Sequence, residues 1–208
     1  MLRHPILRAL IFTFATSTAA LLPIGAAMTF RVVRDLGQPP AAFGLTVTAI
    51  GVGTIVGSVF AARLGPGTNV ARVMLVAVGV VGLANAVAGV VPSLPAVVAL
   101  NAVSGAGEVV VLVVYVSVRA GYSPDALLGR IGSTARVMAL GLMPIASLIG
   151  GSLIDAIGGS ATLVVLGGVM CGFALACTRL SGLRAAEFVP ATPSPATPLP
   201  AMADGLER

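Results

Sequence analysis

The chain has 208 residues, of which 57% are apolar and only 9% are charged. Soluble globular domains carry about 25% charged residues, so this composition excludes a soluble enzyme. The 26 glycines are typical of helices that pack closely within a bilayer. The net charge of +5 comes from arginines scattered singly along the sequence, whereas nucleic-acid-binding domains gather their cations on one face. We therefore predict an integral membrane protein with no nucleic-acid partner.

Six stretches with at most one charge are long enough to cross the hydrocarbon core, which takes about 20 helical residues. They are residues 9–30, 37–62, 73–91, 96–118, 137–154 and 156–178. Beyond residue 183 the apolar pattern stops, and five prolines within 188–201 favour disorder. The sequence thus predicts an all-α membrane protein, with a bundle of six transmembrane helices over residues 1–182. A disordered, proline-rich cytoplasmic tail is expected over residues 183–208.

The arginines predict the orientation of these helices. Ten arginines fall on the side that holds both chain ends and the loops after the second and fourth spans, and only Arg31 and Arg34 fall on the other side. Because cytoplasmic loops are rich in Arg and Lys, both termini are expected in the cytoplasm. The first span also resembles the core of a signal peptide, but it is longer than the roughly 7–15 residues of such a core, so we expect it to be retained.

A short internal repeat relates the second and fifth spans. Residues 55–59 (Ile-Val-Gly-Ser-Val) are similar to residues 149–153 (Ile-Gly-Gly-Ser-Leu), which lie 94 positions later. A repeat of three helices is odd in number, so its two copies must be inverted in the membrane, as in many transporters. We therefore predict two inverted three-helix repeats.

Residues 117–151 carry the most specific pattern in the chain. It comprises residues 123–131 (Ser-Pro-Asp-Ala-Leu-Leu-Gly-Arg-Ile), Arg136, residues 141–144 (Gly-Leu-Met-Pro) and the Gly-Gly pair 150–151. This pattern resembles the carboxy-terminal half of major facilitator superfamily transporters, of the bacterial drug, macrolide and siderophore efflux type. The resemblance covers about residues 3–182 and implies half of a major facilitator fold in the bacterial inner membrane. It also implies that the third and sixth helices lie outside against lipid, while the other four face a cavity.

Three charged residues of this pattern, Asp125, Arg130 and Arg136, are expected at the cytoplasmic surface. Asp125 follows a Ser-Pro helix start, where the helix dipole favours a negative charge. The resemblance implies that they belong to a cytoplasmic gate loop that locks or releases the inward face, since guanidinium groups can bind carboxylates or helix carboxyl ends. Alternatively, the arginines only set the topology and bind lipid phosphate.

Glu108 is the one acidic residue within the predicted spans. A charge at mid-membrane costs on the order of 2.5 kcal/mol or more unless it is paired, hydrated or protonated. Polar residues seven and four positions before it and seven after it form one stripe down the helix, and the first span has a weaker polar face. The predicted substrate and proton pathway consists of Glu108, Asn101, Ser104, Tyr115, Thr13 and Ser17. Alternatively, Glu108 is bonded within the bundle or reaches an interface, and the hydroxyls of the first span bond their own backbone.

The histidine and cysteine content argues against catalysis or metal binding. His4 is the single histidine, and Cys171 and Cys177 lie within an apolar run as small packing residues. An intramembrane hydrolase needs a nucleophile paired with a base, and no such pair is apparent. We predict no enzymatic activity, no metal and no cofactor.

The predicted function is proton-coupled efflux of a small molecule, similar to a drug, macrolide or siderophore, by the carboxy-terminal half of a transporter. The alternative is a non-transporting accessory membrane protein or an inactive transporter fragment. Besides the lipid bilayer, the substrate and protons, the expected partner is a separate amino-terminal half or a second copy of the chain. Without that partner, the polar helix faces, Glu108 included, are expected to be exposed to lipid.

Overall fold

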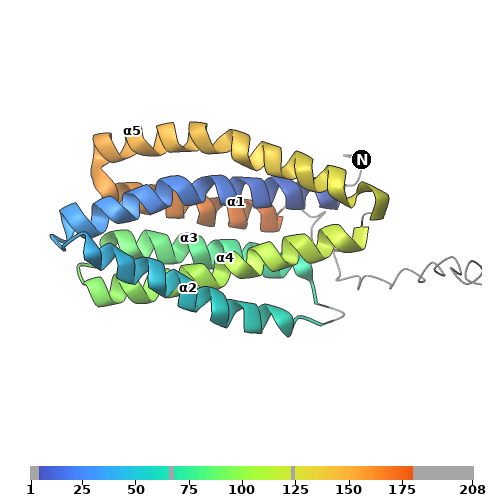
Figure 1. Cartoon of the computed structure of the whole chain (residues 1–208), viewed down its shortest axis with the longest axis horizontal. Coiled ribbons are helices and arrows are strands. Elements are labelled where there is room, and N and C mark those ends of the chain that lie inside the picture. Colours follow the sequence, from blue (N-terminus) through green and yellow to red (C-terminus); the bar gives the residue numbers. More distant parts are fainter. Residues whose placement is uncertain (1–4, 66–67, 123–124, 180–208) are drawn as a thin grey trace, which may run out of the picture.

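The computed structural model describes residues 5–65, 68–122 and 125–179, whose regular elements are all helices. In chain order they are α1 (Pro5–Phe30), the π-helix η1 (Arg31–Asp35), α2 (Ala41–Ala62), α3 (Val70–Val90), α4 (Leu94–Tyr122) and α5 (Asp125–Arg179). The α-helices run along the long axis of the molecule (Figure 1). The predicted proline-rich tail, residues 183–208, lies outside the described residues.

Five helical segments in the described part of the chain are long and apolar enough to cross a membrane. They are Thr13–Asp35, Ala41–Ala62, Val70–Val90, Leu94–Ser117 and Met143–Thr178. Their mean hydropathies run from 1.3 to 2.3, and large apolar side chains remain exposed along their outer faces. The prediction of an all-α, multi-pass membrane protein is therefore confirmed.

The longest element, α5, reverses direction within its length. Gly158 has φ 80 and ψ 170, a conformation that residues with a Cβ rarely adopt. Beyond it the chain runs back past α1 (Figure 1); we call residues 125–157 the first part of α5 and residues 159–179 the second part. The predicted boundary at Asp155 is wrong by three residues, because the backbone freedom of glycine, rather than a charge, decides where the helix breaks.

The first span also ends later than predicted. Instead of stopping at Phe30, the helix continues through η1 to Asp35. Gly37, with φ 61, terminates it, and the N–H groups of Leu36 and Gln38 close the last turn on the carbonyls of Arg31 and Val32. This ending matches the glycine-based helix stop, in which a left-handed residue lets following N–H groups cap the final carbonyls.

Glycines allow α4 and α2 to touch through their backbones. A Cβ added to Gly53 of α2 would lie 2.9 Å from the Cα of Ala102, and one added to Gly105 of α4 would lie 2.9 Å from the Cα of Ile50. These distances are shorter than real Cβ contacts, so only hydrogen fits there. In a bilayer, where apolar side chains gain little by leaving lipid, such close van der Waals packing is what holds helices together.

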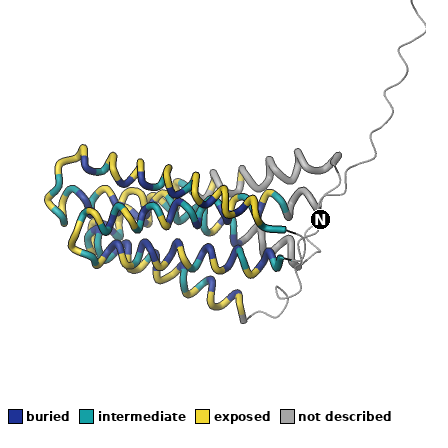
Figure 2. The backbone as a smooth tube through the Cα atoms, turned by 90° about the horizontal axis from the view of Figure 1, so that it is seen from below, coloured by how far each residue is buried: buried dark blue, intermediate teal, exposed yellow. Residues whose placement is uncertain are grey.

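Similar contacts join the remaining helices. A Cβ at Gly150 would lie 2.9 Å from the Cα of Pro23, so the first part of α5 packs on α1. A Cβ at Gly167 would lie 2.6 Å from the backbone nitrogen of Ala86, so the second part packs on α3. Since α3 also packs on α4, it is 56% buried over its span, against 28% for α2. Figure 2 shows the buried residues where helices meet and the exposed ones on the outer faces.

The α2–α4 contact gives a first prediction. Gly53→Ala should destabilise the protein by about 1–3 kcal/mol, because the added methyl group meets the backbone of Ala102. Gly51→Ala is the matched control, since a Cβ there meets nothing within 4 Å. Denaturation by sodium dodecyl sulfate in mixed micelles measures both variants. Equal stabilities for the two would show that this contact is not tight.

Candidate functional site

A buried polar cluster joins α3 to α4 in the middle of the bundle. The Asn85 side chain on α3 donates to the Ser104 hydroxyl on α4 at 3.0 Å. That hydroxyl donates to Oε1 of Glu108, one turn further along α4, at 3.2 Å. Asn85 and Ser104 are 2% and 3% exposed, and Glu108 is half-buried. The structure therefore brings Ser104 and Glu108 together, as predicted, and adds Asn85 from a neighbouring helix.

The rest of the predicted α4 stripe is also buried, with different partners. The Asn101 amide donates to the Val97 carbonyl at 2.8 Å and lies 3.5 Å from the sulfur of Met28 on α1. The Tyr115 ring stacks on Phe14 of α1, with centroids 4.0 Å apart and an interplanar angle of 4°. Asn101 thus lies beside the cluster, while Tyr115 packs between α1 and α4.

Glu108 lies in the wall of two cavities. The larger, of about 300 Å³, is mainly apolar and includes Phe14, Leu21 and Met170 in its lining. The smaller, of about 130 Å³, is lined by Asn85, Asn101 and Ser104 among others. A carboxyl in the wall of two mainly apolar cavities, the smaller of which also has amide and hydroxyl groups in its lining, can accept a proton or hold a cation that enters either one.

Glu108 has no cationic partner among the residues whose side chains the structure describes. The ion pair found there joins Arg31 and Asp35 near one end of the bundle. The hydrogen bond from Ser104 is therefore the polar contact that compensates for the partial burial of this carboxyl. An acid without a counter-ion in a membrane helix is rare outside substrate and ion pathways.

The two α1 hydroxyl residues of the predicted pathway, Thr13 and Ser17, differ in whether they line a cavity. Ser17 lines the larger cavity beside Glu108, and its buried hydroxyl oxygen has no hydrogen-bond partner among the described residues. Thr13 is 3% exposed and is absent from the lining of either cavity. Of the two α1 positions predicted for the pathway, Ser17 therefore lies at the cavity wall.

The expectation that the polar stripe faces lipid in the isolated chain is wrong. Asn101, Ser104 and Tyr115 are each at most 5% exposed, and Glu108 is half-buried. The physical reason is the close approach of α2 and α3 to α4, which its glycines permit. The residues of this stripe are largely covered within this chain, and the exposed faces of the described helices are mainly apolar.

The predicted gate loop is helical. The helix start predicted at Asp125 is confirmed, but α5 continues from there without a break past Arg136, and α4 extends to Tyr122. Little loop therefore remains between the two helices. The side chains of Asp125, Arg130 and Arg136 lie outside the described part of the structure, so their role as a gate remains a prediction.

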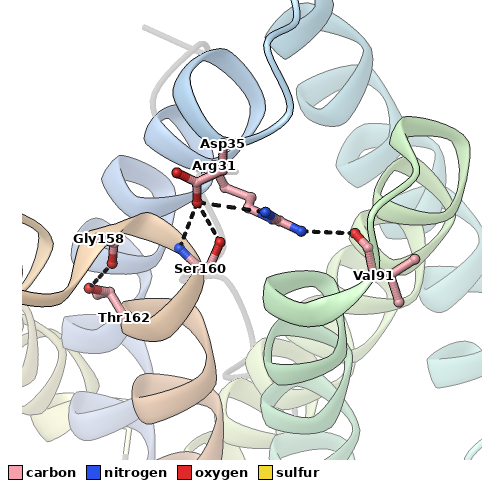
Figure 3. Close-up of polar contacts among 6 residues, drawn as sticks. All are labelled: Arg31, Asp35, Val91, Gly158, Ser160 and Thr162. Atoms are coloured by element: carbon pink, nitrogen blue, oxygen red, sulfur yellow. Dashed lines mark hydrogen bonds and ion pairs between the residues drawn. The ribbon is translucent and has the colours of Figure 1, made fainter.

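A second polar cluster, missed from sequence, joins three segments at one end of the bundle (Figure 3). Asp35 accepts hydrogen bonds from the backbone N–H of Ser160, at 3.0 Å, and from its hydroxyl. Arg31, 8% exposed, lies 3.7 Å from the same carboxylate oxygen and donates to the Val91 carbonyl at 3.0 Å. We call Arg31, Asp35, Val91 and Ser160 the end clamp.

The end clamp satisfies two helix ends from a third helix. Asp35 plays the part of an N-cap for the second part of α5, whose first N–H groups have no carbonyl partner. Arg31 neutralises the carboxyl end of α3, where a cation is favoured. An Arg and an Asp four positions apart at the end of a span would have been the sequence signal for such a pair.

Loss of the clamp carboxylate should be measurable as lost stability. Asp35→Ala removes the acceptor of the Ser160 N–H and hydroxyl and the ion-pair partner of Arg31, and should lower the free energy of unfolding by about 1–3 kcal/mol. Asp155→Ala is the control, an exposed acid without an ion pair or side-chain hydrogen bond in the described structure. Thermal unfolding in detergent measures both, and equal midpoints would contradict the clamp.

No metal site emerges from the described side chains. Within them, no group of three His, Cys, Asp or Glu residues is placed to hold a metal ion. Cys171 and Cys177 are free thiols on the second part of α5, and the Cys171 sulfur lies 3.4 Å from the Gly79 carbonyl of α3. The chemistry of the site therefore centres on a carboxyl, hydroxyls and amides.

Comparison with known proteins agrees with this architecture. Residues 1–207 match the family model MFS_3, described as transmembrane secretion effector. The multidrug efflux pumps Tap of Mycobacterium tuberculosis (strain H37Rv) and Mycobacterium bovis (strain BCG) are each 30% identical to the chain over 185 residues. The match covers 89% of this chain and 44% of each pump, so the chain spans less than half the length of these relatives.

Proposed function

Because this chain belongs to the transmembrane secretion effector family of the major facilitator superfamily, we propose that it forms the carboxy-terminal half of an efflux transporter. We propose further that Glu108 couples its transport to protons. The observation that carries the proposal is the position of Glu108, an acid without a described counter-ion in the wall of two cavities.

The proposed topology has six crossings with both termini in the cytoplasm of a bacterial cell. Met143–Thr178 has 36 residues, which would extend about 54 Å as one straight helix, well beyond the roughly 30 Å of hydrocarbon. The reversal at Gly158 supports a division of this segment into two crossings. The distribution of arginines then favours the Gly158 end as the outer side.

The inverted repeat is proposed from the matching sequences 55–59 and 149–153, whose serine hydroxyls make the backbone hydrogen bond that is usual within a helix. In the first copy the Ser58 hydroxyl donates to the Ile55 carbonyl at 2.7 Å, and in the second the Ser152 hydroxyl donates to the Ile149 carbonyl at 2.9 Å. These residues occupy corresponding positions of the repeat, and all four are exposed. The second helix and the first part of α5 are therefore proposed as equivalent helices of two inverted three-helix units.

A second half is proposed to cover the apolar faces that these two helices leave open. On α2 and the first part of α5 the exposed large side chains include Leu45, Val52, Ile55, Val59, Phe60, Val137, Ile145 and Leu148. Major facilitator transporters enclose their substrate between two such halves. The partner is either a separately encoded amino-terminal half or a second copy, and the transported molecule enters between them.

In the proposed cycle, the substrate is a small, largely apolar molecule, because most of the larger cavity lining is apolar. It binds while Glu108 is ionised and leaves when a proton from outside neutralises this carboxyl. Ser17, Asn101 and Ser104 supply polar contacts along the way, with Thr13 and Tyr115 behind them. Asp125, Arg130 and Arg136 are proposed to lock the cytoplasmic side while the outer side is open.

Cysteine labelling tests the topology, in a background where Cys171 and Cys177 are alanine. With a membrane-impermeant maleimide, Ser93→Cys and Asp155→Cys should react from outside in intact cells, and Arg63→Cys only after permeabilisation. All three positions are exposed. An unreactive Asp155→Cys would mean that α5 crosses the membrane once, and labelling of Ser93→Cys from the cytoplasm would invert the orientation.

Glu108→Gln tests the coupling. The glutamine keeps the size of the side chain but cannot exchange a proton, so export of ethidium driven by a pH gradient should fall to the level of empty vesicles. The assay uses vesicles that contain both halves of the transporter, and Asp155→Asn is the control for a carboxylate-to-amide change at an exposed end. If Glu108→Gln exports as fast as the parent, Glu108 is structural. If the parent chain exports nothing with any partner, the accessory-protein alternative holds.

A further inference from the structure

We infer that Asn85 is a positioning residue for Glu108: it holds the Ser104 hydroxyl in the orientation that donates to the Glu108 carboxyl. Asn85 lies on α3, outside the predicted pathway, and does not itself bond Glu108. The inference rests on the proposed function of Glu108 as the coupling residue, but its test reads the hydrogen bond directly.

The orientation of the Asn85 amide follows from its first partner. Its side-chain nitrogen lies 2.8 Å from the carbonyl oxygen of Val81, within the same helix. A carbonyl oxygen can only accept, so the amide must present N–H there; the flipped amide would bring two oxygens together. Asn85 is 2% exposed, so bulk solvent does not reach the amide to compensate for such a flip.

The second N–H of the amide then fixes the Ser104 hydroxyl. It donates to the Ser104 oxygen at 3.0 Å, which occupies one of the two lone pairs of that oxygen. A serine has a single hydroxyl hydrogen, and here it is directed at Oε1 of Glu108, at 3.2 Å. The hydrogen bonds therefore run in one direction, from the amide of α3 through Ser104 to the carboxyl.

Ser104 differs in this respect from other helical hydroxyls of the chain. Eight described Ser and Thr side chains donate to a carbonyl three or four residues earlier in their own helix: Thr29, Thr46, Thr48, Thr54, Ser58, Ser152, Thr162 and Thr178. This is the usual behaviour of a hydroxyl within a helix. Without Asn85, Ser104 would be free to turn to its own backbone in the same way.

The reach of Asn85 depends on how closely α3 approaches α4. A Cβ added to Gly107 would lie 2.6 Å from the Cγ2 of Val81 and 3.2 Å from the Ala77 carbonyl, so the two helices touch one turn away from Asn85. The Glu108 hydrogen bond is therefore sensitive to the position of α3. Asn85, Ser104 and Glu108 also line the same 130 Å³ cavity.

Infrared difference spectroscopy of the full chain in lipid nanodiscs tests the inference. The carboxyl bands of Glu108 are assigned by their loss in Glu108→Gln, using the C=O stretch of the protonated form or the carboxylate stretch of the ionised form. Asn85→Leu should shift these bands in the same direction as Ser104→Ala, and the double variant should shift them no further. Bands that stay in place in Asn85→Leu, or shifts that add, would overturn it.

The control is Asn101→Leu, which removes another buried amide that donates to a helix carbonyl, that of Val97, but makes no bond to Ser104. It should leave the Glu108 bands in place. Should Asn85→Leu fail to fold, as judged by its amide bands and gel filtration, Asn85→Ala is measured instead. Absence of a protonated Glu108 at any pH would count against proton coupling, while the carboxylate bands would still decide the role of Asn85.

Transport gives an independent readout in vesicles that contain both halves. Asn85→Leu should slow ethidium export about 3- to 10-fold, the loss expected for one hydrogen bond, and should have no further effect in a Ser104→Ala background, because Asn85 acts on Glu108 through Ser104. A merely structural asparagine would slow export or reduce folding equally in the parent and in the Ser104→Ala background. That outcome would refute the positioning role.

Discussion

Close packing around α4 is the constraint on which the rest of the structure depends. Gly105 lets the α2 backbone at Ile50 approach, and Gly107 leaves room for Val81 of α3. In lipid the association of helices relies on such van der Waals contact and on interhelical hydrogen bonds. Here the van der Waals contact makes the interhelical hydrogen bond possible, because Asn85 reaches Ser104 only when α3 lies close to α4.

The same packing explains how a membrane helix can carry a carboxyl. Glu108 is partly covered by neighbouring helices, and Ser104 donates to it, while the described side chains offer it no cation. Glu108 is thus left without a counter-ion among the described side chains, and in the proposed cycle a proton or a cationic ligand takes that place.

The two polar clusters differ in role, one at an end of the bundle and the other in its middle. At one end, Arg31 and Asp35 form an ion pair and cap two other helices, so their charges are satisfied by backbone groups. In the middle, the charge of Glu108 is only partly compensated. The first span contributes to both regions, through Ser17 at the larger cavity and through the end clamp, so a shift of this helix would affect both.

The sequence by itself determined the membrane environment and the helical segments, because hydropathy and span length depend on consecutive residues. The apolar stretches, the helix start at Asp125 and the isolated acid Glu108 could all be identified from it. Tertiary structure decided which polar groups bind each other. Arg31 binds Val91, Asp35 binds Ser160 and Asn85 binds Ser104 across helices. The helix breaks at Gly158 rather than at Asp155 because of the backbone conformation there. Such contacts depend on the particular glycines that allow two helices to approach each other. The spacing of residues along one helix does not reveal which helices these are.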